Sequence, residues 1–286
     1  MRALIIGIDS LIGRALGEKL TELGWKVWGT SRRITEKSGN IYPLDLNRLE
    51  WIEKLPPSDY LFLCAATTKY SECRMNPELS WKINVDAPLT LAHHFSTMGS
   101  HIIFLSSNAV FDGSIPFRPI DSPLSPITCY GRTKAEAEKL LMSSIAAVGI
   151  LRLTKVFHPG DPLFSKWIFS LRTGNKIFPF YDMFMSPIRL DLVIDILLHI
   201  ALANGTGVYQ ASASEDISYY DAGVYLARQI MVDMSLVARE SGKEHMIPSE
   251  ELPRFTTLES YRVAELLKGD FPEPPMRAVE SILRLF

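Results

Sequence analysis

Tyr130 and Lys134 stand four residues apart in the segment CYGRTKAEAEKLL, and this pair is the best candidate for proton-transfer chemistry in the chain. On a helix, residues with this spacing lie on one face, one turn apart. An ammonium group beside a phenol favours the phenolate, which brings a tyrosine with an ordinary pKa of about 10 closer to neutrality. The pair therefore predicts a tyrosine acid or base that is supported by a lysine.

Two other segments carry groups that such a tyrosine would work with. The apolar run HIIFLSS ends in Ser106 and Ser107, whose hydroxyls can hydrogen-bond a substrate oxygen. The run RALIIGIDSLIGRAL breaks into a turn that contains Gly7 and Gly13, which is typical of a strand-to-helix turn that brings backbone amides near a pyrophosphate. Ser10 stands where such turns usually have a middle glycine, and its hydroxyl can cap the helix and contact a phosphate oxygen.

The end of the second predicted strand indicates which dinucleotide would bind. A carboxylate at this point would bind the ribose hydroxyls of NAD, but the sequence has Ser31, Arg32 and Arg33 there. A guanidinium suits a 2′-phosphate, so we expect NADP(H) rather than NAD(H), unless both arginines belong to a solvated turn. The other expected cofactor contacts come from the first turn and from the ends of the third and fourth predicted strands: Leu11, Ile12, Asp45, Leu46, Ala65, Ala66 and Thr67.

These segments need a scaffold, and the first half of the chain predicts one. Short β-rich runs at 2–7, 26–30, 41–44, 60–65, 101–106 and 149–154 alternate with helical patterns at 11–23, 77–98 and 130–147. This rhythm indicates right-handed βαβ units and a parallel sheet that is covered on both faces. We therefore expect an α/β fold, a doubly wound parallel sheet of the Rossmann type, with a smaller C-terminal α/β substrate lobe.

The rhythm loosens after about residue 155, where prolines and aromatic residues interrupt it. A helix at 189–203 and a strand near 207–210 are expected to return to the first domain. We therefore predict a dinucleotide-binding domain of residues 1–155, with a return of about 186–210. Residues 156–185 and 211–286 are predicted to form the substrate-binding lobe.

Composition narrows the class of protein. The chain has 286 residues, 47% of them apolar and 22% charged, with a net charge of −2, which gives no case for a nucleic-acid or membrane partner. Its three cysteines, Cys64, Cys73 and Cys129, lack metal-ligand spacing, so we expect no metal site and read them as reduced thiols of a cytoplasmic protein.

Taken together, these segments resemble an extended short-chain dehydrogenase/reductase, and most closely the dTDP-4-dehydrorhamnose reductase family with its sugar-nucleotide-binding relatives. The resemblance rests on GIDSLIGRAL, LFLCAATTKYSECRMNPELSWKINVDAPLTLA, IIFLSSNAVFDG and, most specifically, PLSPITCYGRTKAEAEKLL. It implies reduction of a 4-keto nucleotide sugar by NADPH. In that reaction Tyr130 would donate the proton, Ser107 the second hydrogen bond, and Lys134 would hold the nicotinamide ribose. Asn84 is implied to be a cofactor residue.

The chain departs from this family's pattern around the substrate. Asn108 and Ala109 replace an Asp-Tyr pair, Lys155 replaces a tryptophan, and Cys64 replaces an asparagine, which implies altered nucleoside and sugar pockets. The expected substrate contacts are Thr68, Asn108, Lys155 and Arg189. Candidates for a substrate diphosphate are Arg152, Lys155, Arg172 and Arg189.

Two alternatives to an active reductase remain open. A nucleotide-sugar epimerase would be expected to carry an acid after the second strand, and a dehydratase would need an acid pair where Asn108 and Ala109 stand. A non-catalytic NADP-binding regulatory subunit that docks onto another enzyme would not need all of Ser107, Tyr130 and Lys134. A homodimer is possible in any of these cases.

Overall fold

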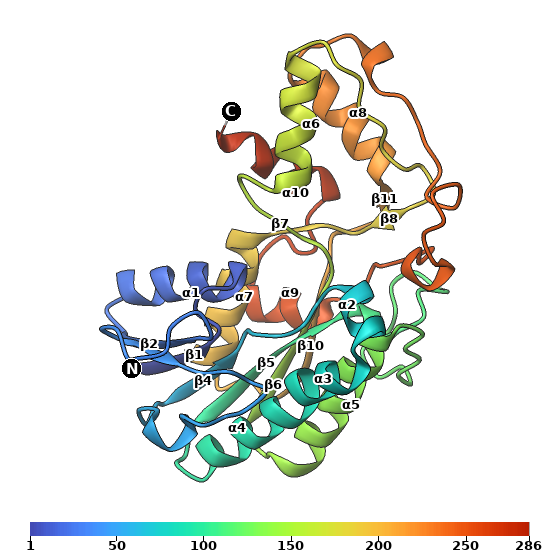
Figure 1. Cartoon of the computed structure of the whole chain (residues 1–286). Helices are drawn as coiled ribbons and strands as arrows, with labels where there is room; N and C mark the ends of the chain where they lie inside the picture. The colour runs from blue at the N-terminus through green and yellow to red at the C-terminus, as the bar shows by residue number, and fades with distance from the viewer. Residues whose placement is uncertain (286) are drawn as a thin grey trace. The chain divides into compact units, whose positions relative to one another are not determined.

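The computed structural model describes residues 1–285 and divides them into two compact units (Figure 1). The first unit holds residues 1–111, 124–152 and 194–209, and the second holds 112–123, 153–193 and 210–285. The second unit thus takes in 112–123, 153–155 and 186–193, which the sequence assigned to the first. Backbone amides hold the segment 112–123 there, because Phe117 N donates to Thr257 Oγ1 at 3.1 Å and Ile120 N to Glu259 Oε2 at 3.1 Å.

A seven-stranded sheet forms the centre of the first unit. Its order is β10-β6-β5-β4-β1-β2-β3, and each of the pairs β1–β2, β1–β4, β2–β3 and β4–β5 is parallel. The strands are β1 (Arg2–Ile6), β2 (Lys26–Ser31), β3 (Ile41–Pro43), β4 (Tyr60–Leu63), β5 (His101–Ser107), β6 (Val148–Leu153) and β10 (Gly207–Ala211). The predicted Rossmann-like α/β fold is confirmed. Strand order reverses between β1 and β4, which places the crevice for a ligand at their carboxyl ends.

Helices cover both faces of this sheet. Figure 1 shows α1 (Leu11–Glu22) on one face and α4 (Ala87–Ser96) and α5 (Cys129–Ser144) on the other. The strands are apolar almost throughout because both faces are buried, and Phe62, Phe95 and Phe104 are fully enclosed. The remaining helices around this unit are α2 (Tyr70–Met75), α3 (Pro77–Trp81) and α7 (Leu190–Leu202).

The single long helix expected at 77–98 is interrupted. Between α3 and α4, the segment Lys82–Asp86 forms a π-helical turn, which inserts an extra residue into the helical repeat. Asn84 lies in this turn, and its side chain is fully buried. Such turns are frequent at functional sites, and this one carries a residue that the sequence assigned to the cofactor.

The second unit is a smaller α/β lobe. Its strands pair as β7 (Val156–Phe157) with β9 (Ile188–Arg189), in parallel, and β8 (Phe184–Met185) with β11 (Ile217–Ser218), antiparallel. Its helices are α6 (Pro162–Arg172), α8 (Tyr219–Gln229), α9 (Tyr261–Leu267) and α10 (Pro275–Ile282). Phe157 and Trp167 both pack edge-to-face on Phe164 in its core. Across residues 1–285, no helix has the length and apolar character needed to cross a bilayer.

Candidate active site

The turn between β1 and α1 depends on its two glycines. Gly7 has φ +86°, and a Cβ there would lie 2.7 Å from Cβ of Ala65. A Cβ on Gly13 would lie 2.2 Å from the carbonyl oxygen of Gly7. A side chain at either position would push the turn away from β4 or from the start of α1. Ser10 caps α1 and accepts a hydrogen bond from Gly13 N at 3.1 Å, so its hydroxyl proton stays available for an anion.

A cavity of about 380 Å³ opens at the carboxyl ends of β1, β2 and β4. Most of the expected cofactor residues line it: Gly7, Ser10, Leu11, Ile12, Ser31, Arg32, Arg33, Asp45, Leu46, Ala65, Ala66 and Thr67. Thr68, which was expected to contact substrate, lines it too. Further lining residues were not expected from the sequence: Ile6, Asp9, Thr30, Leu44, Cys64 and Ile83.

Asn84 holds the segment after β4 in place. Its Oδ1 accepts a hydrogen bond from Thr67 N at 2.8 Å, and its Nδ2 donates to Thr67 O at 2.9 Å and to Thr133 Oγ1 at 3.1 Å. The side chain is buried and outside the cavity lining, so these contacts make Asn84 a positioning residue for Thr67, which lines the cavity. Gly13 likewise supports the turn from outside the lining.

The start of α5 brings Tyr130 to Ser107. Thr128 caps the helix by accepting a hydrogen bond from Gly131 N at 2.9 Å. A Cβ on Gly131 would lie 2.0 Å from the carbonyl oxygen of Ala109, so only glycine lets the helix pack this closely on the segment after β5. Tyr130 and Ser107 come close enough across this contact for the Ser107 hydroxyl to lower the pKa of the phenol. Two residues from distant segments, both predicted to be catalytic, are therefore adjacent.

Ser107 and its neighbour Ser106 have different surroundings. Ser107 Oγ accepts a hydrogen bond from Ala109 N at 3.2 Å and lies 3.4 Å from Asn108 Oδ1, to which it donates. Ser106 Oγ is buried and has no hydrogen-bond partner within residues 1–285. The contact with Tyr130 therefore identifies Ser107 as the serine of the pair that can take part in chemistry.

Burial controls the acidity of Tyr130. It raises the pKa of the phenol, the neighbouring Tyr70 acts in the same direction, and the hydrogen bond from Ser107 opposes them. The rings of Tyr130 and Tyr70 lie 5.8 Å apart between centroids. Within residues 1–285, Lys134 adds no shift of its own, so the expectation that it lowers the pKa of Tyr130 is wrong. The phenol keeps its proton at neutral pH.

Lys134 lies one turn further along α5, and it is only 3% exposed. Its Nζ lies 3.7 Å from the centroid of the Phe104 ring. Burial lowers the pKa of Lys134 to about 7, although nearby Glu138 and Cys64 pull it upward. Burial also raises the pKa of the Cys64 thiol to about 12, with Lys134 acting in the opposite direction. Lys134 is thus the group of the predicted triad that titrates near neutral pH.

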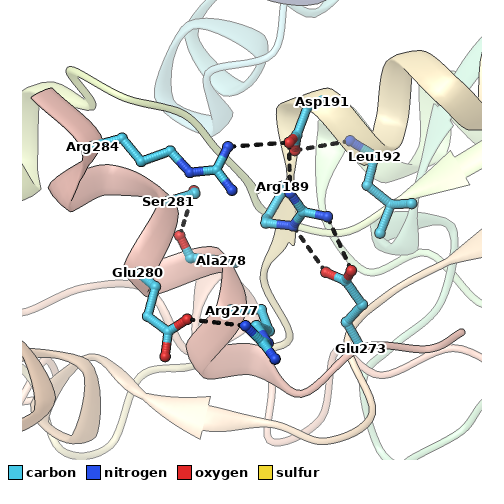
Figure 2. Close-up of polar contacts among 9 residues, drawn as sticks. All are labelled: Arg189, Asp191, Leu192, Glu273, Arg277, Ala278, Glu280, Ser281 and Arg284. Carbon is cyan, nitrogen blue, oxygen red and sulfur yellow. Dashed lines mark hydrogen bonds and ion pairs between the residues drawn. The ribbon is translucent and has the colours of Figure 1, made fainter. Parts of the chain in front are cut away.

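Two arginines that were expected to bind a substrate diphosphate form ion pairs with carboxylates of this chain. Arg152 is buried and donates through Nη2 to Glu138 Oε2 at 2.7 Å. Figure 2 shows Arg189 in the second unit, held by Glu273 on one side and Asp191 on the other. The Nε–Oε2 distance to Glu273 is 2.9 Å, and the Nη1–Oδ2 distance to Asp191 is 2.5 Å. Both guanidinium groups are therefore already paired with carboxylates in this structure.

Three further residues were expected at the substrate: Lys155, Asn108 and Arg172. Lys155 is exposed in the second unit, and its carbonyl oxygen accepts a hydrogen bond from Ile188 N at 2.9 Å. Asn108 begins the short 3-10 turn after β5 and holds the Ser107 hydroxyl. Arg172 is exposed at the end of α6.

Comparison with known proteins shows which family the chain belongs to. The family model described as RmlD substrate binding domain matches residues 1–282. A curated relative, the methionine adenosyltransferase 2 subunit beta of Bos taurus, is 30% identical over 184 residues, which are 61% of this chain and 55% of that protein. The match thus spans only about half the length of that relative.

Solved structures show the same fold. The dTDP-4-dehydrorhamnose reductase of Clostridium acetobutylicum is 22% identical, with a TM-score of 0.86 over 100% of this chain and 99% of that one. The dTDP-4-dehydrorhamnose reductase of Bacillus anthracis, solved with NADP, is 17% identical, with a TM-score of 0.85 over 100% and 99%. The glycine turn and the neighbouring Ser107 and Tyr130 agree with the family match, and the chain belongs to the family described as RmlD substrate binding domain.

Proposed function

We propose that this protein is an NADPH-dependent reductase of a 4-keto nucleotide sugar. The observation that carries the proposal is the close packing of the start of α5 on the segment after β5, which brings Tyr130 to Ser107 in the unit that also holds the glycine-turn cavity. In the proposed arrangement the first unit binds the dinucleotide and the second unit supplies the contacts to the sugar nucleotide. The departures at Asn108, Lys155 and Cys64 support a substrate other than dTDP-4-dehydrorhamnose itself.

The proposed reduction needs a proton donor and a hydrogen-bond donor beside the carbonyl oxygen of the substrate. A bound nicotinamide would supply the hydride for the carbonyl carbon, and the carbonyl oxygen would then need a proton. Tyr130 donates its proton to that oxygen, and Ser107 stabilises it with a second hydrogen bond. Because burial keeps the phenol protonated, the acid is ready before the reaction begins. A positioned donor of this kind contributes roughly 3–4 kcal/mol at the transition state.

The cofactor contacts follow from the cavity lining. Backbone amides at the start of α1 and the hydroxyl proton of Ser10 would bind the pyrophosphate. Arg32 would bind the 2′-phosphate of NADP(H), because it lines the cavity and forms no ion pair or hydrogen bond with other described residues. Asp45 and Leu46, which also line the cavity, would contact the adenine. Lys134 lies outside that lining, and its role in holding the nicotinamide ribose rests on the family resemblance.

Turnover with a defined panel tests the proposal. The purified protein would be mixed with NADPH and 4-keto sugars carried on different nucleoside diphosphates, and loss of nicotinamide absorbance would be followed. We expect oxidation with at least one sugar and recovery of a reduced sugar nucleotide. Tight NADPH binding without turnover across the panel would contradict the reductase proposal. Interconversion of sugar epimers without net oxidation of cofactor would favour an epimerase instead.

A second candidate function is a non-catalytic, NADP-binding regulatory subunit. It is favoured by the 30% identity to a protein named as a subunit of methionine adenosyltransferase. In this case the chain would bind NADPH, leave all keto sugars unchanged, and alter the rate of an added methionine adenosyltransferase catalytic subunit. An unchanged rate, with no complex in gel filtration, would count against this candidate.

A further inference from the structure

Asp9 joins the glycine turn to the end of β2. It lies between Gly7 and Gly13, and its side chain is 28% exposed. Its Oδ2 accepts a hydrogen bond from Ser31 Oγ at 3.1 Å and lies 3.2 Å from Arg33 Nε. Arg33 N in turn donates to Ser31 Oγ at 3.0 Å. The three side chains thus form a closed cluster at one end of the cavity.

This cluster places a carboxylate where the sequence had indicated that none was present. In dinucleotide-binding sheets, an acid beside the end of the second strand binds the ribose hydroxyls of NAD. Here the acid comes from the turn after β1 instead, and it lines the same cavity as Ser31, Arg32 and Arg33. No hydrogen bond to its second oxygen, Oδ1, exists within the described residues, so that oxygen can accept one from a ribose hydroxyl.

The same carboxylate acts against a 2′-phosphate in two ways. It holds the guanidinium of Arg33, and its own negative charge repels a phosphate at the ribose. Arg32 has no such partner among residues 1–285 and is left to supply the attraction. Removing the charge of Asp9 would therefore help one cofactor and harm the other.

We propose that Asp9 determines cofactor specificity, by accepting a ribose hydroxyl of NADH and restraining Arg33, so that the site binds both NADH and NADPH. This inference rests on the proposed binding of a nicotinamide dinucleotide and modifies the preference that Arg32 and Arg33 would otherwise set. It concerns affinity in the absence of turnover, so its test does not depend on knowing the sugar.

The direct test is titration of the full chain with NADH and with NADPH, followed by calorimetry or nicotinamide fluorescence. Asp9→Asn keeps the size of the side chain and removes its charge. We expect the Kd for NADPH to fall about tenfold and the Kd for NADH to rise by at least about threefold. Asp45→Asn is the matched control, because it removes the same charge from the same cavity at the expected adenine contact. It should move both affinities in the same direction.

Two outcomes would overturn the inference. One is a change in the same direction for both cofactors in Asp9→Asn, or no change at all. The other is failure of wild-type protein to bind either dinucleotide, which would overturn the proposed function as well and is recognised before any variant is made. If the wild type binds a dinucleotide but Asp9→Asn leaves the ratio of the two Kd values unchanged, only the role of Asp9 is contradicted. The reductase proposal is not affected by that result.

A second set of variants covers the case in which Asp9→Asn does not fold. If Asp9 restrains Arg33, then Arg33→Ala should weaken NADPH binding less than Arg32→Ala does, by at least about threefold in Kd. Equal losses from the two arginine variants would contradict the proposed restraint.

Discussion

The side chain of Asn84 forms hydrogen bonds with both backbone groups of Thr67. The N–H of Thr67 donates to Oδ1 at 2.8 Å, and its carbonyl oxygen accepts from Nδ2 at 2.9 Å. A third bond joins Nδ2 to Thr133 Oγ1 on α5 at 3.1 Å. One buried amide thus connects the cavity-lining segment after β4 to the helix that carries Tyr130 and Lys134.

We therefore expect Asn84→Ala to destabilise the fold. The substitution leaves buried backbone groups of Thr67 without partners, which costs on the order of 3 kcal/mol in the free energy of unfolding. Urea unfolding measures this, and NADPH affinity should fall in the same variant because Thr67 lines the cavity. Asn40→Ala, at an exposed position, is the control. A loss below about 1 kcal/mol in Asn84→Ala would show that water replaces these bonds.

The two adjacent serines predict a paired experiment. Ser107→Ala removes the hydroxyl that lies beside Tyr130 and lowers the pKa of its phenol, and we expect kcat to fall by about 10²-fold. Ser106→Ala removes a buried hydroxyl that has no partner within residues 1–285 and should leave kcat close to the wild-type value. Steady-state kinetics with NADPH and a keto sugar nucleotide compare them. Similar losses of kcat in both variants would contradict a specific role of the Ser107 hydroxyl, because any change at the end of β5 would then lower the rate.

Lys134 predicts an unusual dependence of stability on pH. Burial lowers its pKa from 10.5 to about 7 in the folded state, so the unfolded chain binds more protons between these values and stability rises with pH across that window. Below pH 7 both states are protonated, and the full cost of the buried charge is present. Lys134→Met should therefore be more stable than wild type at pH 6, by a few kcal/mol at most, with the difference shrinking toward pH 10.

Urea unfolding of both proteins at several pH values measures this difference. Lys139→Met on the exposed side of the same helix is the control and should show no such trend. A constant difference between Lys134→Met and wild type from pH 6 to pH 10 would contradict the lowered pKa of Lys134.

The buried pair of Arg152 and Glu138 predicts a structural effect rather than an effect on substrate. Arg152→Met leaves the Glu138 carboxylate buried without its partner, which costs about 3–5 kcal/mol of stability. Adding Glu138→Leu should recover much of the loss, because both charges are then absent. Thermal and urea unfolding of the two variants check this. A raised KM with unchanged stability in Arg152→Met would instead support the expected contact of Arg152 with a substrate diphosphate.

The sheet and the glycine turn could be predicted from the sequence because each has a local pattern of its own. Strand and helix alternation predicted the sheet, and Gly7 and Gly13 predicted the turn because their conformation and close contacts exclude other residues. Tyr130 and Ser107 could be predicted as partners only through the family resemblance, since nothing local in the sequence brings α5 to the end of β5.

The remaining features depend on partners that are remote in the chain. The sequence does not show that Arg189 forms an ion pair, because its partner Glu273 lies 84 residues away in the chain. The burial of Lys134 likewise depends on how Phe104 packs against α5. The sequence gives no sign that Asp9 lies at the ribose position, because Asp9 precedes the second strand by many residues. The fold places the first turn, and Asp9 with it, against the end of that strand. Such pairings follow from tertiary packing and cannot be read from spacing alone.

The central claim is that Tyr130 gives the substrate its proton. The most direct measurement is the rate of NADPH oxidation by Tyr130→Phe, compared with Tyr60→Phe, which removes a buried hydroxyl from the start of β4. We predict a loss of about 10³-fold in kcat for Tyr130→Phe, with NADPH still bound, and a near-normal rate for Tyr60→Phe. A Tyr130→Phe protein that reduces the sugar as fast as the wild type would contradict the proposed mechanism.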